Sequence, residues 1–294
     1  MRFSSLTVLL APLAFTFTLA KPTGNDKIPT PGGHRPSSSV YEITAGGSLS
    51  ILGAAVHVLA ADGNIVHVST ASVGGQVPTK LTGDSSRALQ TNGWIAYAWW
   101  LNPGLAPISS FATTWVVPPA PETYHGQTIF LFNGIQPNAS SAILQPVLQY
   151  GPSNAGGNAS WAVAIWFVYS TGNAFFTTPV PVDPGATLEA TITLIASNGT
   201  TFDYNAQFSN VPGTSMNVTG SRELTFAVET LEAYGVSSIS DYPVGSTVFE
   251  GIQLGLVDDA TPSVVWSHED DAADGVLLAV DRDGANDARM TITY

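Results

Sequence analysis

Alternation of apolar and polar residues dominates the chain from residue 92 onward and predicts many short strands. Gly, Pro, Asn and Asp separate these runs at the spacing of a β-sandwich. The pattern predicts an all-β fold: a packed sandwich of two sheets with a concave face. The expected strands are Trp94–Trp100, Ser110–Val117, Gln127–Phe132, Ala142–Tyr150, Trp161–Tyr169, Thr187–Ile195, Phe202–Phe208, Ser215–Thr219, Leu224–Tyr234, Thr247–Leu256, Gly275–Val280 and Met290–Tyr294.

The stretch from Ser141 to Tyr150 places two uncharged amides on one side of an otherwise apolar strand. Gln145 and Gln149 share a face with Ile143 and Val147. An amide that is buried without a partner is costly, so each needs something to bind. The simpler interpretation is an edge strand with one solvent-exposed face. The alternative is that Gln145 faces a functional group.

The segment from Glu223 to Gly235 fits two periods. Its apolar residues also have helical spacing, with Gly235 as a C-cap. The all-β context favours a strand, which puts Glu232 on one face with Thr230 and Tyr234, and Glu229 on the other. Glu229 is a rival candidate for chemistry if the segment is helical.

The first 87 residues differ from the rest. Residues 1–20 have the positive start, apolar core and small-residue end of a secretory signal. Residues 21–39 are rich in Pro, Gly and Ser and are predicted to be disordered. Short β-like runs follow at 50–52, 55–59 and 65–68. We interpret 21–87 as a propeptide, processed after Arg87, or as an N-terminal β element of a mature protein whose main domain is 88–294.

Charge and composition narrow the function. After residue 87 only three basic residues remain against 18 acidic ones, a net charge of 3 − 18 = −15. Such an acidic domain repels nucleic acid, and its charge favours a protein that functions at low pH. No later run is apolar enough to span a bilayer. The chain has no cysteine, so the domain must rely on its core. Four glycosylation sequons support secretion; they begin at Asn138, Asn158, Asn198 and Asn217.

Several chemistries lack their motifs. There is no Gly-x-Ser-x-Gly elbow, no Cys/His cluster for zinc and no phosphate-binding glycine loop. Two acidic segments, 268–271 and 281–287, are candidates for calcium, although a solvated turn is the simpler interpretation. Carboxylate chemistry remains, because a carboxylate beside a carboxamide is a sufficient hydrolytic pair without a cofactor or metal.

Five segments, in order, are similar to motifs of one family. They are Asn92-Gly-Trp-Ile-Ala, Trp115-Val-Val-Pro118, Phe132-Asn-Gly-Ile-Gln136, Ala142-Ile-Leu-Gln145 and Ala227-Val-Glu-Thr-Leu-Glu232-Ala-Tyr234. Together they resemble the glutamic peptidases, or eqolisins, which are secreted fungal acid endopeptidases. The resemblance implies a bent antiparallel β-sandwich, a concanavalin A-like jelly roll. It also implies that Gln145 and Glu232 are catalytic and face each other within hydrogen-bond reach of one shared water.

The remaining site predictions follow from the same resemblance. Substrate-binding residues are expected at Trp94, Phe132, Gln136, Gln149, Trp166 and Tyr234. The chain departs from the family where Gln136 and Gln149 replace acidic residues, and Pro146 is expected to distort the strand after Gln145. Because these acidic residues around the expected catalytic pair are replaced, two functions are compatible with the sequence. One is an acid endopeptidase that acts on proteins or peptides as a monomer. The other is a silent, lectin-like sandwich that binds polysaccharide or peptide in the same groove.

Overall fold

The structure of the protein, a computed structural model, describes residues 27–70, 92–138, 142–169 and 172–294. Strands dominate these ranges, and the predicted all-β fold is confirmed. Three single-turn 3₁₀ helices interrupt them, at Ser37–Ser39, Ile239–Asp241 and Ala272–Asp274. Within the same ranges, no helix is long and apolar enough to cross a membrane. The predicted signal at 1–20 and the predicted processing point at Arg87 lie outside the described residues.

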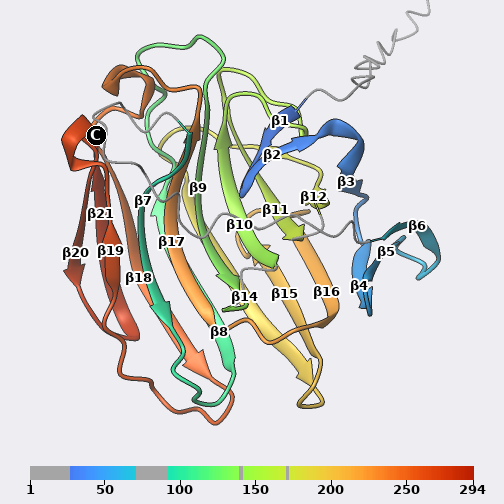
Figure 1. Cartoon of the computed structure of the whole chain (residues 1–294). Helices are drawn as coiled ribbons and strands as arrows, with labels where there is room; N and C mark the ends of the chain where they lie inside the picture. Colours follow the sequence, from blue (N-terminus) through green and yellow to red (C-terminus); the bar gives the residue numbers. More distant parts are fainter. Residues whose placement is uncertain (1–26, 71–91, 139–141, 170–171) are drawn as a thin grey trace, which may run out of the picture.

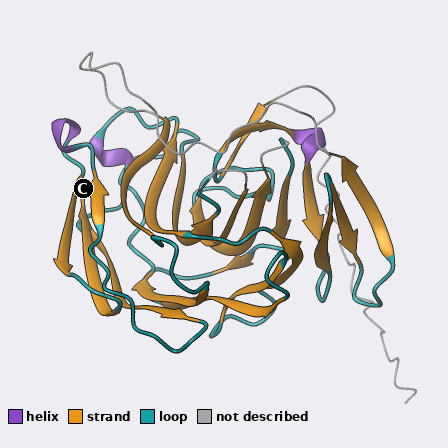
Figure 2. Ribbon diagram, turned by 60° about the horizontal axis from the view of Figure 1, so that its bottom comes forward, coloured by secondary structure: helices purple, strands orange, loops and turns teal. Residues whose placement is uncertain are grey.

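Two large sheets form the two layers of a sandwich (Figures 1 and 2), and a small hairpin forms a separate two-stranded sheet. Sheet I contains, in spatial order, β19 (Ser267–Glu269), β7 (Asn92–Leu101), β17 (Phe226–Tyr234), β9 (Thr128–Gln136), β10 (Ala142–Tyr150), β11 (Trp161–Tyr169), β12 (Ala174–Thr177) and β3 (Val40–Ile43), with β13 (Val180–Pro181) also on β11. Sheet II contains β20 (Leu277–Arg282), β21 (Asn286–Thr293), β18 (Ser246–Leu256), β8 (Ile108–Val116), β14 (Thr187–Ser197), β15 (Phe202–Phe208), β16 (Ser215–Ser221), β4 (Ser48–Leu52), β5 (Ala55–Leu59) and β6 (Ile65–Thr70). The hairpin is β1 (Lys27–Thr30) with β2 (Gly33–Pro36).

The main hydrophobic core fills the space between the sheets, where alternate residues of both layers meet. A second cluster covers the outer face of sheet I, opposite that core. Its buried members are Val40, Trp94, Tyr97, Phe130, Phe132, Ile143, Val147, Ala164, Trp166, Val168, Ala174, Phe176, Val228 and Tyr234. An antiparallel sheet commonly leaves one face to solvent. The outer face of sheet I is therefore unusual, because its side chains are buried although they point away from the core between the sheets.

The central strands agree with the alternation in the sequence. Strands β10, β11 and β15 have the predicted bounds, and the ambiguous segment 223–235 is a strand, β17. Glu232 and Tyr234 face outward on β17, whereas Glu229 faces the core. Around Pro146 the register of β10 with β11 runs unbroken from Ala142 to Tyr150, whereas the pairing of β10 with β9 omits Gln145 and Pro146, so the interruption is confined to the β9 side.

A β-bulge in β7 changes the direction of one tryptophan. Simple alternation puts Trp94 and Trp100 on the same face, but Leu231 pairs with Ala96 while the next residue, Glu232, pairs with Trp94. The extra residue, Ile95, reverses the alternation. Trp94 consequently lies on the outer face of sheet I, and Trp100 lies in the core.

The predicted disorder over 21–39 is wrong for the part that is described. Residues 27–36 form the β1–β2 hairpin, whose Pro-Gly-Gly turn lies at 31–33. Strand β3 then pairs in parallel with β12 at the edge of sheet I, and β4 pairs in parallel with β16 in sheet II. The other strand pairs are antiparallel wherever the structure describes them. The N-terminal segment therefore extends both layers of the sandwich.

Candidate functional site

Most of the predicted site residues lie on the outer face of sheet I. Trp94, Phe132, Trp166 and Tyr234 belong to its hydrophobic cluster, and Glu232 is fully buried among them. Period-two alternation along β7, β9, β11 and β17 accounts for this gathering, together with the bulge that turns Trp94 outward. The outer face therefore brings aromatic side chains and one carboxyl group together.

The Glu232 carboxyl group is held by donors from two directions. The backbone N–H of Gly32, in the turn of the β1–β2 hairpin, donates to both carboxylate oxygens, at 2.9 Å to Oε1 and 3.0 Å to Oε2. The hydroxyl of Tyr234 donates to Oε1. Alternate residues of a strand share a face, which places Tyr234 beside Glu232. The Gly32 contact joins segments 200 residues apart.

Burial raises the pKa of Glu232 to about 7, because water no longer solvates the charge. Hydrogen bonds from Tyr234, Gly32 and Trp94 oppose this rise in the pKa. The positive charge of Arg35, on β2, lowers the pKa further. Burial also raises the pKa of Tyr234 well above its usual range, so its hydroxyl keeps its proton and remains a donor. Glu232 is thus poised to gain or lose a proton near neutral pH.

Gln145 is the second polar group on this face. Its side chain is fully buried, and neither its Oε1 nor its Nε2 has a hydrogen-bond partner. It lies opposite Trp166 on β11, and on its other side Gln145 and Ile143 pack so close to Gly134 of β9 that a Cβ atom there would lie 3.1 Å from Ile143. Because a buried amide without partners is costly, Gln145 is a group that a bound molecule could satisfy.

The strand register does not place Gln145 and Glu232 opposite each other. Glu232 of β17 is level with Phe130 of β9 and, one strand further, with Gln149 of β10. Gln145 of β10 is level with Gly134 of β9, because the preceding residue of β10, Leu144, pairs with Ile135. Four residues along the strands and two strands across correspond to roughly 13 Å and roughly 10 Å in a flat sheet. No direct hydrogen bond joins the two side chains among the described contacts. A bound group would have to bridge them.

The other two predicted amides differ from each other. Gln149 donates to the carbonyl groups of Gly151 and Gly156 and accepts from the Ser153 hydroxyl. These bonds fix the loop after β10, which leaves Gln149 a structural role. Gln136, at the end of β9, is buried and its Oε1 has no partner.

Glu229, the rival carboxyl group, lies in the core between the sheets. The Thr113 hydroxyl of β8 donates to its Oε1, and its Oε2 has no partner. Burial raises its pKa well above the usual range, and the Thr113 bond opposes this only in part. Its neighbour in the register, Asn133, is fully buried with both amide atoms unpartnered. Glu229 is therefore a fully buried core carboxyl group, and its burial favours the protonated form.

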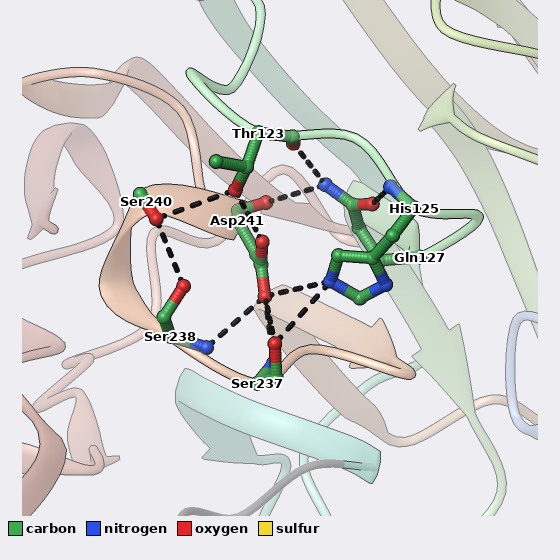
Figure 3. Close-up of polar contacts among 7 residues, drawn as sticks. All are labelled: Thr123, His125, Gln127, Ser237, Ser238, Ser240 and Asp241. Atoms are coloured by element: carbon green, nitrogen blue, oxygen red, sulfur yellow. Dashed lines mark hydrogen bonds and ion pairs between the residues drawn. The ribbon is translucent and has the colours of Figure 1, made fainter.

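A separate polar cluster joins the loop before β9 to the 3₁₀ helix at 239–241 (Figure 3). Asp241 Oδ2 lies 3.0 Å from His125 Nε2 and 2.9 Å from Ser237 Oγ. Burial raises the pKa of Asp241, but hydrogen bonds, the first of them from Thr123, outweigh it and hold the pKa below its usual range. The same network includes Gln127, Ser238 and Ser240.

Ser237, His125 and Asp241 have the residue types of a nucleophilic triad but not its geometry. A triad histidine contacts serine through one ring nitrogen and the carboxylate through the other. Here His125 Nε2 contacts both Asp241 and, at 3.3 Å, the Ser237 hydroxyl. The imidazole therefore cannot relay a proton between them, and the cluster serves to fix two loops.

The predicted glycosylation and calcium segments lie on the surface. The four sequon asparagines, Asn138, Asn158, Asn198 and Asn217, are all exposed. In the segment 281–287, Arg282 pairs with Asp287, and Asp283 accepts from the backbone N–H groups of Trp266 and Gly284. The Gly284 bond lies within the turn between β20 and β21, and the Trp266 bond ties that turn to the segment before β19.

Two contributors to the site were not predicted from the sequence. Gly32 and Arg35 come from the segment that was expected to be disordered. The Pro-Gly-Gly run at 31–33 is a turn signal between residues that can form strands, and it could have indicated a hairpin. Nothing in the local pattern indicates which surface that hairpin contacts.

No family model matches this chain, and no curated protein matches it. Among solved structures, it is similar to Scytalido-glutamic peptidase with a peptide-based transition-state analog (14% identity, 70% of this chain and 98% of that one, TM-score 0.44). It is also similar to aspergilloglutamic peptidase from Aspergillus niger (17%, 57% and 98%, TM-score 0.33) and to a toad ovary galectin with thio-digalactose (14%, 54% and 98%, TM-score 0.31). With TM-scores below 0.5, these similarities do not assign the chain to a family.

Proposed function

We propose that this chain is a secreted acid endopeptidase in which Glu232 and Gln145 act together on a peptide bond. The observation that carries the proposal is the outer face of sheet I. It combines a buried carboxyl group whose pKa lies near neutrality with a buried carboxamide that has no partner. Perturbed carboxyl groups and unsatisfied polar groups in one place are typical of functional sites.

The two groups supply complementary parts of a hydrolysis. Ionised Glu232 takes a proton from water, and that water attacks the peptide carbonyl. The Gln145 N–H stabilises the negative oxygen that develops on the carbon. Protonated Glu232 then gives its proton to the leaving amine. Because the strand register separates the two residues, the substrate carbonyl and the attacking water would lie between them, over Phe132.

The surroundings suit a peptide rather than a small charged substrate. The face that carries both groups is lined by aromatic side chains, among them Trp94 and Trp166. Such rings pack against apolar side chains of a substrate. The strongly acidic domain would tolerate work at low pH, where its carboxylates lose their mutual repulsion.

Hydrolysis of a denatured protein between pH 2 and pH 7, with pepstatin present, tests the proposal on the acid-incubated full chain. The wild type is expected to cleave in mild acid, with a rate that rises toward pH 7 as Glu232 ionises. Gln145→Ala and Glu232→Gln are each expected to lower the rate at least about 100-fold, as loss of an oxyanion donor or general base does. Glu229→Gln is the matched control, and it should keep the wild-type rate within a few-fold.

Two results would reject the peptidase. One is a folded wild type that does not cleave at any pH, and the other is equal loss of rate in Glu229→Gln and Glu232→Gln. The four-residue offset between Gln145 and Glu232 favours a lectin-like binding protein as the second candidate. In that case the unpartnered amides and aromatic rings of the outer face would bind a saccharide or peptide without cleaving it. Binding assays with both ligand types would then replace the hydrolysis.

A further inference from the structure

We propose that Arg282 and Arg289 form a binding site for a sulfate or phosphate group, which becomes available in acid. The two side chains belong to sheet II, on the face that points away from the core, because the residues on either side of Arg289, Ala288 and Met290, lie in that core. The inference does not depend on the proposed hydrolysis, since Glu232 lies on the other sheet.

The two arginines lie directly opposite each other at the edge of sheet II (Figure 1). After residue 87 the chain has only three basic residues, Arg222, Arg282 and Arg289. The register between β20 and β21 shifts at Asp281, and this shift pairs Arg282 of β20 with Arg289 of β21. Like charges in a directly opposed cross-strand pair are destabilising. The pair therefore needs negative charge beside it.

A hollow of about 290 Å³ lies beside the two guanidinium groups. A bulge in β18 contributes to it, because Gly251 has a φ angle of +59° and a Cβ atom there would meet nothing within 4 Å. One water molecule takes about 30 Å³ in the liquid, so the hollow has room for a tetrahedral oxyanion together with water. The hollow is lined by Thr114, Glu250, Gly251, Arg282, Asp287 and Arg289.

Both guanidinium groups keep N–H donors that the described contacts do not use. Arg282 donates through Nη1 alone, to the backbone carbonyl and the carboxylate of Asp287. Arg289 donates through Nη1 to Glu250 Oε2 at 3.1 Å, and its Nε lies 3.7 Å from Asp281 Oδ2. A guanidinium group has five N–H donors, in a geometry that matches pairs of phosphate oxygens. The remaining donors can therefore bind a further anion.

The carboxylates around the pair make the site dependent on pH. At neutral pH, Asp281, Asp287 and Glu250 supply the negative charge that the arginines need. Carboxyl groups generally lose their charge below about pH 4, whereas guanidinium groups keep theirs. Thr114 of β8 adds only a hydroxyl, and the carboxylate of Asp283 accepts from backbone N–H groups. Acid therefore leaves two opposed cations without their counter-charges.

The ion pairs are exposed enough for a ligand to replace them. The side chains of Arg282 and Asp287 are 53% and 69% exposed, and those of Arg289 and Glu250 are 42% and 48% exposed. Ion pairs in contact with water contribute little to stability. A ligand that binds in acid must stay ionised there, which excludes carboxylates. A phosphate group stays charged, because only its second proton has a pKa of about 6, and a sulfate group is the stronger acid.

NMR of the arginine side chains in the full chain tests the site. Their Cζ signals are followed while sodium sulfate replaces sodium chloride at constant ionic strength, at pH 3.5 and at pH 7. The signals of Arg282 and Arg289 are expected to move together and to saturate at pH 3.5. Binding should be at least about tenfold weaker at pH 7, because ionised carboxylates then repel sulfate and occupy the arginines. Arg222, which is exposed after β16, is the internal control and should not saturate.

Variants separate a specific site from the general attraction of anions to a protein whose carboxylates are protonated. Arg282→Met and Arg289→Met should each lower the affinity for sulfate at pH 3.5 at least about tenfold, whereas Arg222→Met should keep it. The double variant Glu250→Gln with Asp287→Asn lacks the competing charges and should bind sulfate at pH 7 as the wild type does in acid. Asparagine tolerates the φ angle of +55° at Asp287.

Titrations with inorganic phosphate and with a sugar phosphate ester distinguish a free ion from a group carried by a glycan, and saturation of both arginines by either one supports the site. The proposal is overturned if the three arginines respond equally to sulfate at pH 3.5, or if the wild-type affinity does not change with pH. Calcium that moves the signals of Arg282 and Arg289 at pH 7, without any sulfate response in acid, would assign the segment to a cation instead. Because the double variant is measured at pH 7, the test holds even if the wild type unfolds in acid.

Discussion

Glu229 and Glu232 lie three residues apart on β17, and both side chains are fully buried. Burial raises the pKa of both groups. Glu229 faces the core with a single donor, the hydroxyl of Thr113. Glu232 faces outward and is met by a backbone N–H, a tyrosine hydroxyl and a nearby arginine.

The difference between them shows what separates a core carboxyl group from a functional one. Desolvation alone favours the neutral acid and would leave both groups protonated. Donors aimed at the oxygens stabilise the ionised form, and Glu232 has more of them than Glu229. A perturbed pKa is therefore a weak marker of a site, and the arrangement of donors is the stronger one.

The largest effect that separates the two carboxyl groups is expected in the pH dependence of stability. Native Glu232 holds its proton up to about pH 7, whereas the unfolded chain releases it near 4.5. Its contribution is therefore complete below pH 4.5 and is lost as the pH rises to about 7, an effect of roughly 3 kcal/mol. Glu232→Gln should remove this loss, and urea unfolding at a series of pH values measures it.

The matched variant on the core side should leave the effect of Glu232 in place. Burial raises the pKa of Glu229 well above its usual range, so Glu229 also loses stability as the pH rises. Glu229→Gln should remove only that contribution and keep the slope between pH 4.5 and pH 7 that is due to Glu232. A wild type and a Glu232→Gln variant with parallel stability curves from pH 4.5 to pH 7 would contradict the assignment.

The donors themselves give the next effect. Tyr234→Phe removes a hydroxyl that lowers the pKa of Glu232, so that pKa should rise above 7. At pH 8 the loss of a hydrogen bond to a charged group should cost about 2 kcal/mol. Thr113→Val removes the only donor described for Glu229 and should cost less, about 1 kcal/mol, because that group is neutral. Carbon-13 NMR titration of the two carboxyl groups checks the pKa changes, and equal shifts would refute the contrast.

The opposite orientation of Glu229 and Glu232 could be predicted from the alternation of side chains along a strand. Alternation along β17 puts Glu229 and Glu232 on opposite faces, and the structure agrees once the segment is a strand. Alternation could not predict that Ile95 forms a bulge that turns Trp94 outward. The offset of Gln145 from Glu232 depends on the register between β9 and β10, which the connecting segment sets and a pattern within one strand does not encode.

The hairpin was beyond local reasoning for a different reason. Its Pro and Gly residues are typical of disorder as well as of tight turns. The contact that orders it joins Gly32 to a residue 200 positions away. The turn meets a carboxyl group that β17 presents on the outer face of sheet I, so neither segment indicates the contact by itself. The resemblance to peptidase motifs likewise pointed to Glu232 and not to what covers it.

The smallest expected effect on stability concerns two buried amides on neighbouring strands. Like Glu229 and Glu232, one of them faces the core and the other faces outward. Asn133 on β9 faces the core beside Glu229, and Gln145 on β10 faces outward. Neither has a hydrogen-bond partner for either amide atom. Replacement of an unpartnered polar side chain by an apolar one removes a desolvation cost, so Asn133→Leu and Gln145→Leu should each raise stability by about 1 kcal/mol.

Function should separate these two equal gains in stability. Asn133 touches nothing on the outer face, so Asn133→Leu should leave hydrolysis of a denatured protein unchanged. Gln145→Leu should abolish hydrolysis, because it removes the proposed oxyanion donor. The unpartnered amide would then lower stability in exchange for catalytic function. Unfolding in urea and hydrolysis in acid are measured on the same two variants. If both variants keep full activity, the amide of Gln145 is unsatisfied for a reason other than catalysis, and the mechanism with Glu232 loses its second residue.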